Sequence, residues 1–345
     1  DCLLSRGLGD VYKRQVDKYI NGYTKPETRN CDDCITPFYD TIAELLSDKN
    51  QQVFYYRKVL WQYLVDNHGF TGVYCNFCHY LKKYPEFDSY FRKSRPSNTN
   101  KVTIRYETPM GKQAQLDWKE SIPFILSSGE TIEVNIFVLL LSYSRFRVYR
   151  VSLSKTQDIL FSFLDDAFET FGGVPDEIVT DNMKTVMDEA RTEYYAGKVN
   201  NKFQQFADDY GFKVQPCIAG HPHTKAKVEA PMKILDEIRA YNGKLNYREL
   251  VELVTRINNR VNAQVNQGTG RIPMMYYNKE KAFLNNLPAD NIRKPYQITT
   301  NTVKVNHSSM FNYKRCQYSV PPEYIDKIVS LQVYDGYIHV YCNTE

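Results

Sequence analysis

The stretch QAQLDWKE, residues 113–120, has the alternation of a β-strand and carries a carboxylate in its middle. In such a strand Ala114, Leu116 and Trp118 point to one face and Asp117 points to the other. A carboxylate inside a central strand costs free energy unless it is paired or binds a cation. The stretch therefore predicts a strand and a candidate site, although an aspartate on an edge strand has the same pattern.

Two more strand-like segments follow at 131–142 and 146–153, and a short turn joins them into an antiparallel meander. Apolar spacing then predicts a helix over Thr156–Phe171, which Gly172-Gly173 ends. The next expected elements are a strand at Glu177–Thr180, a helix at Asn201–Tyr210, a strand at Phe212–Ile218 and a helix from Thr224 to about Tyr241. This order is that of an α/β, ribonuclease-H-like fold, although order alone permits other mixed sheets.

Length and composition bound the class of protein. At roughly 150 residues per domain, 345 residues are enough for two or three domains. The chain is 42% hydrophobic and 24% charged, which excludes a disordered or collagen-like protein. Its longest strongly apolar run, Ile136–Leu141, is far shorter than the roughly 18 residues of a membrane helix. Eight cysteines and no signal peptide favour a cytoplasmic protein with no membrane partner.

The net charge of +4 conceals an alternation along the chain. Residues 79–112 carry eight Lys or Arg against three Asp or Glu, residues 113–240 carry 14 against 19, and residues 271–330 carry nine against four. Basic flanks around an acidic centre suit a protein that holds a polyanion at its ends and gathers carboxylates in its middle. Solvated surface charge explains the same pattern without a ligand.

Three helices are expected before residue 85. Apolar spacing predicts one after Thr36-Pro37 and one over Gln51–Asn67, and Val73–Tyr84 is the third, after the break GFTG at 69–72. This is the outline of a helix-turn-helix DNA reader, and also of a small helical subdomain without that function. The candidate DNA contacts on the third helix are Tyr74, Asn76, His79, Lys82 and Lys83.

Short β-rich segments end the chain, with Asp335-Gly336 as a strong hairpin signal. They predict a small β-barrel, expected to be incomplete because the sequence stops just after a strand. The expected units are an adaptor-like segment at 1–15, a helix-turn-helix domain at 16–91, a basic linker at 92–112, a ribonuclease-H-like catalytic core at 113–245, a helical connector at 246–295 and the small β-barrel at 296–345. Arg92, Lys93 and Arg95 in the linker are further candidates for DNA contact.

Two further carboxylates join Asp117 as candidates for chemistry. Asp181 follows the strand EIVT at its carboxyl end, where α/β sheets place ligands, although an aspartate that opens a turn occupies such a position too. Glu229 lies in KAKVEAPMK, where Pro231 keeps it near a helix end, although its lysine neighbours also make an ordinary ion-pair stripe. Three such carboxylates can bind two Mg²⁺ ions about 3.5–4 Å apart.

Those ions would serve phosphodiester chemistry. One would activate an attacking water or DNA 3′-hydroxyl, and the other would stabilise the leaving oxygen during in-line displacement. Mg²⁺ prefers hard oxygen ligands, which carboxylates supply, and Mn²⁺ accepts the same ligands.

Three motifs carry a resemblance to a known family. QLDW around Asp117, VTDNMKT around Asp181 and GHPHTKAKVEAPMK around Glu229 resemble the DDE motif of the retroviral-integrase superfamily, and above all the IstA-type transposases of the insertion-sequence twenty-one family. The spacings of 64 and 48 residues between the acids are similar to that family's. GFTGVYCNFCHYLKKYPEF at 69–87 is similar to its helix-turn-helix, and YSVPPEYI at 318–325 to the entry of its C-terminal barrel. The resemblance spans roughly residues 66–341. The sequence differs from the family at Ala226, where a glycine is common. No segment matches the family's first N-terminal helix-turn-helix.

The resemblance implies a DNA transposase that cuts transposon ends and joins the 3′-hydroxyl to target DNA. It implies that Asp117, Asp181 and Glu229 are catalytic and bind Mg²⁺, and that a homo-oligomer acts on double-stranded DNA with an IstB-like AAA+ ATPase helper in the bacterial cytoplasm, at the nucleoid. The lysines expected to face the phosphates, or else to serve only solubility, are Lys184, Lys225, Lys227 and Lys233. The alternatives are a catalytically inactive DNA-binding relic and a ribonuclease-H-like nuclease without strand transfer.

Two C-x-x-C pairs suggest a structural metal. Cys31, Cys34, Cys75 and Cys78 can supply a tetrahedral zinc site, although the 40 residues between the pairs exceed common ribbon spacing. The alternative for Cys75 and Cys78 is that they are small buried residues that bind no metal.

Overall fold

The computed structural model describes residues 16–17, 20–21, 34–92, 107–218, 232–334 and 336–342. Several sequence predictions fall outside the described residues: the adaptor-like segment 1–15, most of the linker with Lys93 and Arg95, and also Cys31, Lys225, Lys227 and Glu229.

A five-stranded sheet with the order β3-β2-β1-β4-β7 forms the centre of the protein. The strands are β1 (Gln113–Ile125), β2 (Thr131–Leu141), β3 (Arg147–Ser152), β4 (Glu177–Thr180) and β7 (Lys213–Pro216). The first three form the predicted antiparallel meander, and β4 and β7 continue the sheet in parallel to β1. This order confirms the ribonuclease-H-like, integrase-type core expected from the sequence.

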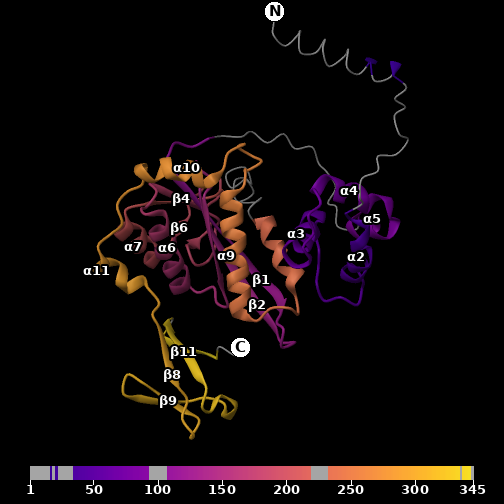
Figure 1. Ribbon diagram of the computed structural model, residues 1–345. Helices are drawn as coiled ribbons and strands as arrows, with labels where there is room; N and C mark the ends of the chain where they lie inside the picture. Colours follow the sequence, from indigo (N-terminus) through magenta and orange to yellow (C-terminus); the bar gives the residue numbers. More distant parts are fainter. Residues whose placement is uncertain are drawn as a thin grey trace, which may run out of the picture.

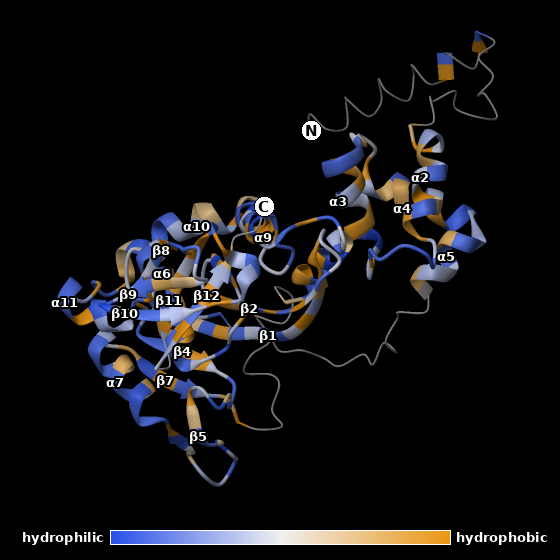
Figure 2. Cartoon of the chain, turned by 90° about the horizontal axis from the view of Figure 1, so that it is seen from below, coloured by the Kyte–Doolittle hydropathy of each residue, from blue (hydrophilic) through white to orange (hydrophobic). Residues whose placement is uncertain are grey.

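Helices cover both faces of the sheet (Figure 1). Phe137 and Leu139 pack against α6 (Gln157–Phe171) and α7 (Asn201–Tyr210), whereas Val138 and Leu140 belong to the cluster on the side of α9 (Tyr247–Ala263). Alternate residues of β2 therefore enter opposite cores, which is why this strand is continuously apolar. Figure 2 shows the apolar residues concentrated along the central strands.

Local signals set the ends of the helices that pack on the sheet. The Asn200 side chain caps α7 by accepting from the backbone N–H groups of Lys202 and Phe203. Gly172 and Gly211 end α6 and α7 in the left-handed conformation, at φ of 66° and 74°. The sequence predicts a strand over Gln113–Lys119, and β1 is six residues longer, because a bulge after Lys119 restarts the pairing with β2 at Ile122.

The described residues 34–92 contain the three predicted helices and a fourth. They are α2 (Tyr39–Leu45), which follows η1 (Thr36–Phe38), then α3 (Arg57–His68), α4 (Tyr74–Lys83) and α5 (Pro85–Arg92). The sequence analysis did not predict α5. Its first residue is a proline, whose fixed φ and missing N–H suit a helix start.

This helical region packs on the rest of the protein. Ile42, Leu60 and Phe77 lie in the same hydrophobic cluster as Val138 of β2 and Leu253 of α9. The contact runs through η3 (Leu235–Tyr241): Val53 N donates to Arg239 O at 3.0 Å, and Asn67 Nδ2 donates to Tyr241 OH at 3.1 Å. The predicted domain boundary is therefore not a boundary of the hydrophobic core.

The remaining short elements lie around the core. A hairpin of β5 (Met187–Glu189) and β6 (Lys198–Val199) follows β4. Residues 247–296 contain α9, α10 (Pro273–Glu280), η4 (Lys281–Phe283), α11 (Asp290–Arg293) and η5 (Lys294–Tyr296). Buried Glu280 accepts from Gly111 N at 3.2 Å and from Ser144 N at 3.0 Å, which fixes α10 beside the start of β1.

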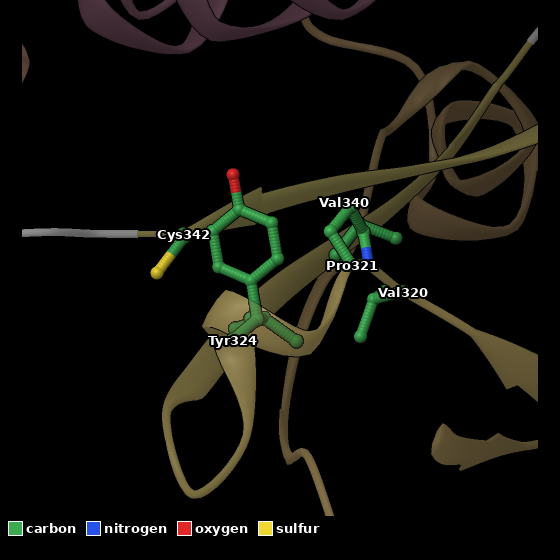
Figure 3. Close-up of a pocket in the computed structure, with 6 residues that line it drawn as sticks. Val320, Pro321, Tyr324, Val340 and Cys342 are labelled. Atoms are coloured by element: carbon green, nitrogen blue, oxygen red, sulfur yellow. The ribbon is translucent and has the colours of Figure 1, made fainter. Parts of the chain in front are cut away.

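The C-terminal region forms two small antiparallel sheets from its described residues. Strands β8 (Thr300–Lys304), β11 (Ile328–Tyr334) and β12 (Tyr337–Cys342) make one sheet, β9 (Met310–Tyr313) and β10 (Cys316–Ser319) make a hairpin, and η6 (Pro322–Tyr324) lies between β10 and β11. A closed barrel remains a prediction. A pocket of about 110 Å³ next to η6 is lined by Val320, Pro321, Tyr324, Val329, Val340 and Cys342 (Figure 3). Because this lining has no carboxylate, the pocket is not the predicted acidic site.

Candidate functional site

The parallel register of β1 and β4 brings two of the predicted acids to the same edge of the sheet. Leu116 of β1 is paired with Thr180 of β4, and Asp117 and Asp181 are the residues that directly follow this pair. Neighbouring strands lie about 4.8 Å apart. Two aspartates that are distant in the sequence are therefore neighbours, with Asp117 half-buried and Asp181 exposed.

An open depression adjoins Asp117. Its volume is about 300 Å³, and Asp117, Lys119, Met232, Lys233 and Asp236 line it. The backbone N–H of Trp118 donates to Asp117 Oδ1 at 2.9 Å. Met232 and Lys233, which line it with Asp117, come three and four residues after Glu229 in the sequence, and Glu229 itself lies outside the described residues.

The loop after β4 is fastened to the end of β7 by side chains that the sequence analysis did not assign. Asn182 Nδ2 donates to Cys217 O at 3.0 Å, and Asn182 Oδ1 accepts from Arg191 N at 2.8 Å. Arg191 Nη1 donates to Pro216 O at 2.9 Å. The available sequence signal was the position of Asn182 directly after Asp181, because an amide side chain can both donate and accept hydrogen bonds.

The donor atoms near the strand ends fit a hard cation, because carboxylate oxygens are the ligands that Mg²⁺ prefers. Within the described ranges no group of three or more His, Cys, Asp or Glu side chains is placed to hold a metal ion. Those ranges do not include Glu229, so they contain two of the three predicted ligands.

Two of the predicted phosphate-facing lysines lie in the described part of the chain, and both are exposed. Lys184 comes three residues after Asp181, and Lys233 lines the depression beside Asp117. Both cations are therefore close in sequence or in space to the paired aspartates.

Helix α4 has a polar and basic exposed side. Asn76, His79, Lys82 and Lys83 are exposed, as predicted for a recognition helix, while its apolar residues are buried. Tyr74 differs from them: it is half-buried, with its ring centroid 5.9 Å from that of Trp61. Burial, aided by a hydrogen bond with Cys78, raises the pKa of Tyr74 to about 12, so the phenol stays neutral. Arg92 is the last residue of α5.

The described members of the two C-x-x-C pairs are free cysteines. Cys34 and Cys75 are exposed and Cys78 is half-buried. Their exposure argues against the alternative that the second pair consists of buried small residues, since only one of its members is even partly covered. Cys31 lies outside the described residues, so a four-cysteine zinc site stays a prediction.

Among the described residues, none of the helices has the length and apolar character needed to cross a membrane.

Comparisons with known proteins agree along almost the whole chain. The family model "Integrase core domain" matches residues 109–222, and "Mu transposase, C-terminal domain" matches residues 291–345. The chain is 55% identical to the transposase for insertion sequence element IS232 of Bacillus thuringiensis subsp. berliner, over 99% of this chain and 79% of that protein. It is 30% identical to a putative transposase for IS5376 of Geobacillus stearothermophilus, over 99% and 81%. It is 27% identical to the transposase for IS21 of Pseudomonas aeruginosa, over 96% and 81%.

Proposed function

The chain belongs to the insertion-sequence transposases of the IS21 type, which are DDE polynucleotidyl transferases, and we propose that it cuts the ends of its element with Asp117, Asp181 and Glu229. The same site would then join the freed 3′-hydroxyl to target DNA. The observation that carries this assignment is the β1–β4 register, which makes Asp117 and Asp181 neighbours directly after the pair Leu116 and Thr180.

The position of the third acid is supported by the chain that follows it. Met232 and Lys233 line the depression next to Asp117, so only two residues separate Glu229 from a residue that borders the site. This short separation in sequence supports the proposal that Glu229 belongs to the same site.

Two Mg²⁺ ions, or Mn²⁺ in their place, would activate the attacking oxygen and stabilise the leaving oxygen when bound by the three carboxylates. The side chains of this protein supply the rest. Asn182 holds the loop of Asp181 against the end of β7, and exposed Lys184 and Lys233 offset the charge of DNA phosphates. Lys225 and Lys227 are proposed to contact the same phosphates.

DNA recognition is assigned to the N-terminal helices. Asn76, His79, Lys82 and Lys83 are exposed on α4, which we take as the recognition helix of a helix-turn-helix. Arg92, Lys93 and Arg95 are proposed to contact the DNA backbone. The enzyme would act as a homo-oligomer on double-stranded transposon ends and target, with an IstB-like AAA+ ATPase, at the nucleoid in the bacterial cytoplasm.

The proposed units are the helix-turn-helix region at 16–91, the linker at 92–112, the core at 113–245, the connector at 246–295 and a C-terminal barrel at 296–345. A structural zinc ion held by Cys31, Cys34, Cys75 and Cys78 would brace the first unit. Elemental analysis of the purified chain tests this, and zinc well below one atom per chain would exclude it.

Strand transfer with oligonucleotide ends and Mg²⁺ tests the catalytic assignment. Asp181→Asn should abolish both cleavage and joining, because it removes a ligand charge at the carboxyl end of β4. Asp176→Asn is the matched control, because Asp176 precedes the opposite end of the same strand. It should retain activity.

The outcomes separate the alternatives. Joined products that survive Asp181→Asn would contradict the catalytic role. DNA retardation without cleavage by the parent chain would identify an inactive binder, and cleavage without joined products would identify a nuclease.

A further inference from the structure

The loop of the β5–β6 hairpin, residues 190–197, is fastened beside Asp181. Within this hairpin loop, the backbone N–H of Arg191 donates to Asn182 Oδ1 at 2.8 Å, and its guanidinium donates to Pro216 O at 2.9 Å. Asn182 directly follows Asp181, and Pro216 is the last residue of β7. Figure 2 shows the hairpin projecting from the core below β4 and β7. The hairpin loop therefore starts at the edge of the sheet where the proposed chemistry takes place.

The hairpin loop presents Tyr194 to solvent. This residue is 96% exposed, although it comes only three residues after Arg191. Three residues span at most about 11 Å, which limits the distance between the Cα atoms of Tyr194 and Arg191. Because the Arg191 backbone contacts the residue next to Asp181, the exposed ring lies close to the loop that carries this acid.

Hydrogen bonds fix the backbone on both sides of Tyr194. Thr192 N donates to Tyr195 O at 2.9 Å, and Tyr195 N donates to Thr192 Oγ1 at 3.1 Å. Tyr195 OH donates to Glu189 Oε2 at 2.6 Å, so this second tyrosine is held against β5. A Cβ on Gly197 would lie 2.9 Å from Glu189 O, which shows how closely the two sides of the hairpin approach. A ring on such a fixed backbone loses less entropy on binding than a ring on a mobile loop.

The charges of the hairpin decide which part of DNA it can contact. Its exposed charged side chains are three acids and one lysine: Asp188, Glu189, Glu193 and Lys198. Carboxylates repel phosphates, so this hairpin is not suited to follow the DNA backbone. A base has an uncharged π-face, and stacking on an aromatic ring needs no cation. A single exposed tyrosine is ordinary on a protein surface, but here its fixed position beside the site gives it a ligand.

We propose that Tyr194 is a DNA-contact residue, whose ring stacks on a base at the end of the insertion element, next to the phosphate that is cut. This inference rests on the proposed function, because the assignment of Asp181 determines where the cut phosphate lies. It divides the work between two kinds of contact. Exposed Lys184 and Lys233 offset the charge of the phosphates, and Tyr194 holds a neighbouring base.

Binding titrations with duplex oligonucleotides of the element's end test this contact. All variants are made in the Asp181→Asn background, so that binding is measured without cutting. Tyr194→Ala should weaken binding about tenfold, whereas Tyr194→Phe keeps the ring and should bind like the parent. The slope of log affinity against log salt concentration should stay the same in Tyr194→Ala, because no charge is removed. Circular dichroism melting should show unchanged stability, because the side chain is exposed.

Phe283→Ala is the matched control for the loss of an exposed ring. Phe283 is 60% exposed and lies beside Gly111. Gly111 O accepts from the backbone N–H of Asp176, which precedes β4 at the end opposite to Asp181. The Phe283 variant should bind DNA as tightly as its parent.

Abasic sites identify the stacked base. The bases of the last few pairs before the cut are removed one at a time, each in its own oligonucleotide. For the parent, removal of the stacked base should weaken binding about tenfold. For Tyr194→Ala, removal of the same base should cost nothing more, because the two changes delete the two sides of one contact.

The results distinguish this inference from the assignment of the acids. If Tyr194→Ala binds as tightly as its parent, or if its effect adds to that of every abasic site, the stacking contact is wrong. If Tyr194→Phe is as weak as Tyr194→Ala, the hydroxyl group makes the contact, which also overturns stacking. If Asp181→Asn still joins DNA ends, the proposed function fails, and the abasic comparison still decides whether the Tyr194 ring contacts a base.

Discussion

Arg293 of α11 forms a buried, two-point ion pair with Asp165 of α6. Arg293 Nε lies 2.6 Å from Asp165 Oδ1, and Nη2 lies 3.2 Å from Oδ2. Tyr210 OH and Gln297 Nε2 also donate to the Asp165 carboxylate, each at 2.7 Å. The Asp165 carboxylate therefore connects α11 and the residues after it, which lead into the C-terminal sheets, to α6 and α7.

Arg293→Met should lower the free energy of unfolding by about 3–5 kcal/mol, because it leaves the buried Asp165 charge without its partner. Urea unfolding of the whole chain measures this. The double variant Arg293→Met/Asp165→Leu should lose less free energy of unfolding than the sum of the losses in the two single variants, since it leaves neither charge of the pair without its partner. A loss below about 1 kcal/mol in Arg293→Met would show that water already solvates the pair.

The same carboxylate predicts a pH dependence. Burial opposes its charge, but the hydrogen bonds from Arg293, Tyr210 and Gln297 outweigh burial, so the pKa of Asp165 lies below its ordinary value. Its contribution to stability is therefore complete above the unfolded pKa of about 3.9 and is lost as the pH falls through the lower folded pKa. The stability difference between the parent chain and Asp165→Asn should stay constant from neutral pH to about pH 5 and shrink below about pH 4. A difference that already disappears near pH 6 would contradict the lowered pKa.

Gly111→Ala should destabilise the protein more than Gly69→Ala. Both glycines have left-handed backbones, with φ of 68° and 65°, so an alanine costs about 1–2 kcal/mol of strain at either position. A Cβ at Gly111 would also lie 2.2 Å from the Phe283 carbonyl oxygen, whereas a Cβ at Gly69 meets nothing within 4 Å. We expect the Gly111 variant to lose about 1–3 kcal/mol more in urea unfolding. Equal losses of stability in the two variants would mean that Phe283 of η4 moves away from the added Cβ at no cost in free energy.

Asn182→Ala should slow strand transfer by about 10- to 100-fold while DNA affinity changes little. The substitution removes both hydrogen bonds that hold the loop of Asp181 to Cys217 and Arg191, and it leaves the acids in place. Single-turnover kinetics and a binding titration measure the two effects separately. Asn306→Ala, which removes a turn amide in the C-terminal region, is the control and should change neither.

Lys82→Ala/Lys83→Ala should weaken binding to the ends of the insertion element. The slope of log affinity against log salt concentration should become shallower by about 0.9 for each DNA phosphate that the protein no longer neutralises. The two lysines are exposed at the end of α4. Binding titrations at several salt concentrations give the slope. Lys213→Ala on β7 is the control and should leave the slope unchanged, and a double variant with an unchanged slope would remove α4 from the DNA interface.

Local signals allowed parts of the fold to be predicted to the residue. Strand β4 and helix α7 have their predicted bounds, and Gly211 ends α7. Asp117 and Asp181 are neighbours because they directly follow the paired residues Leu116 and Thr180, and their shared catalytic role stays a prediction. Helix α5 and the hairpin of β5 and β6 were missed because they are short: α5 has eight residues, and the two strands have three and two.

Contacts between distant segments were beyond sequence reasoning. The ion pair between Lys119 and Asp236 depends on where η3 packs against β1, and this packing has no local signal in the sequence. The links from Asn182 to Arg191 and from Arg293 to Asp165 likewise need a known register and a known packing of helices.

The hydrophobic cluster shared by Phe77, Val138 and Leu253 has a consequence for dissecting the enzyme. A truncated chain that starts at the sheet would present to water the apolar surface that the N-terminal helices now cover, and it should aggregate or melt early. The intact chain should instead show a single cooperative thermal transition for both regions. Movements of the N-terminal helices relative to the central sheet must therefore break apolar packing, which makes these two parts a mechanically linked unit.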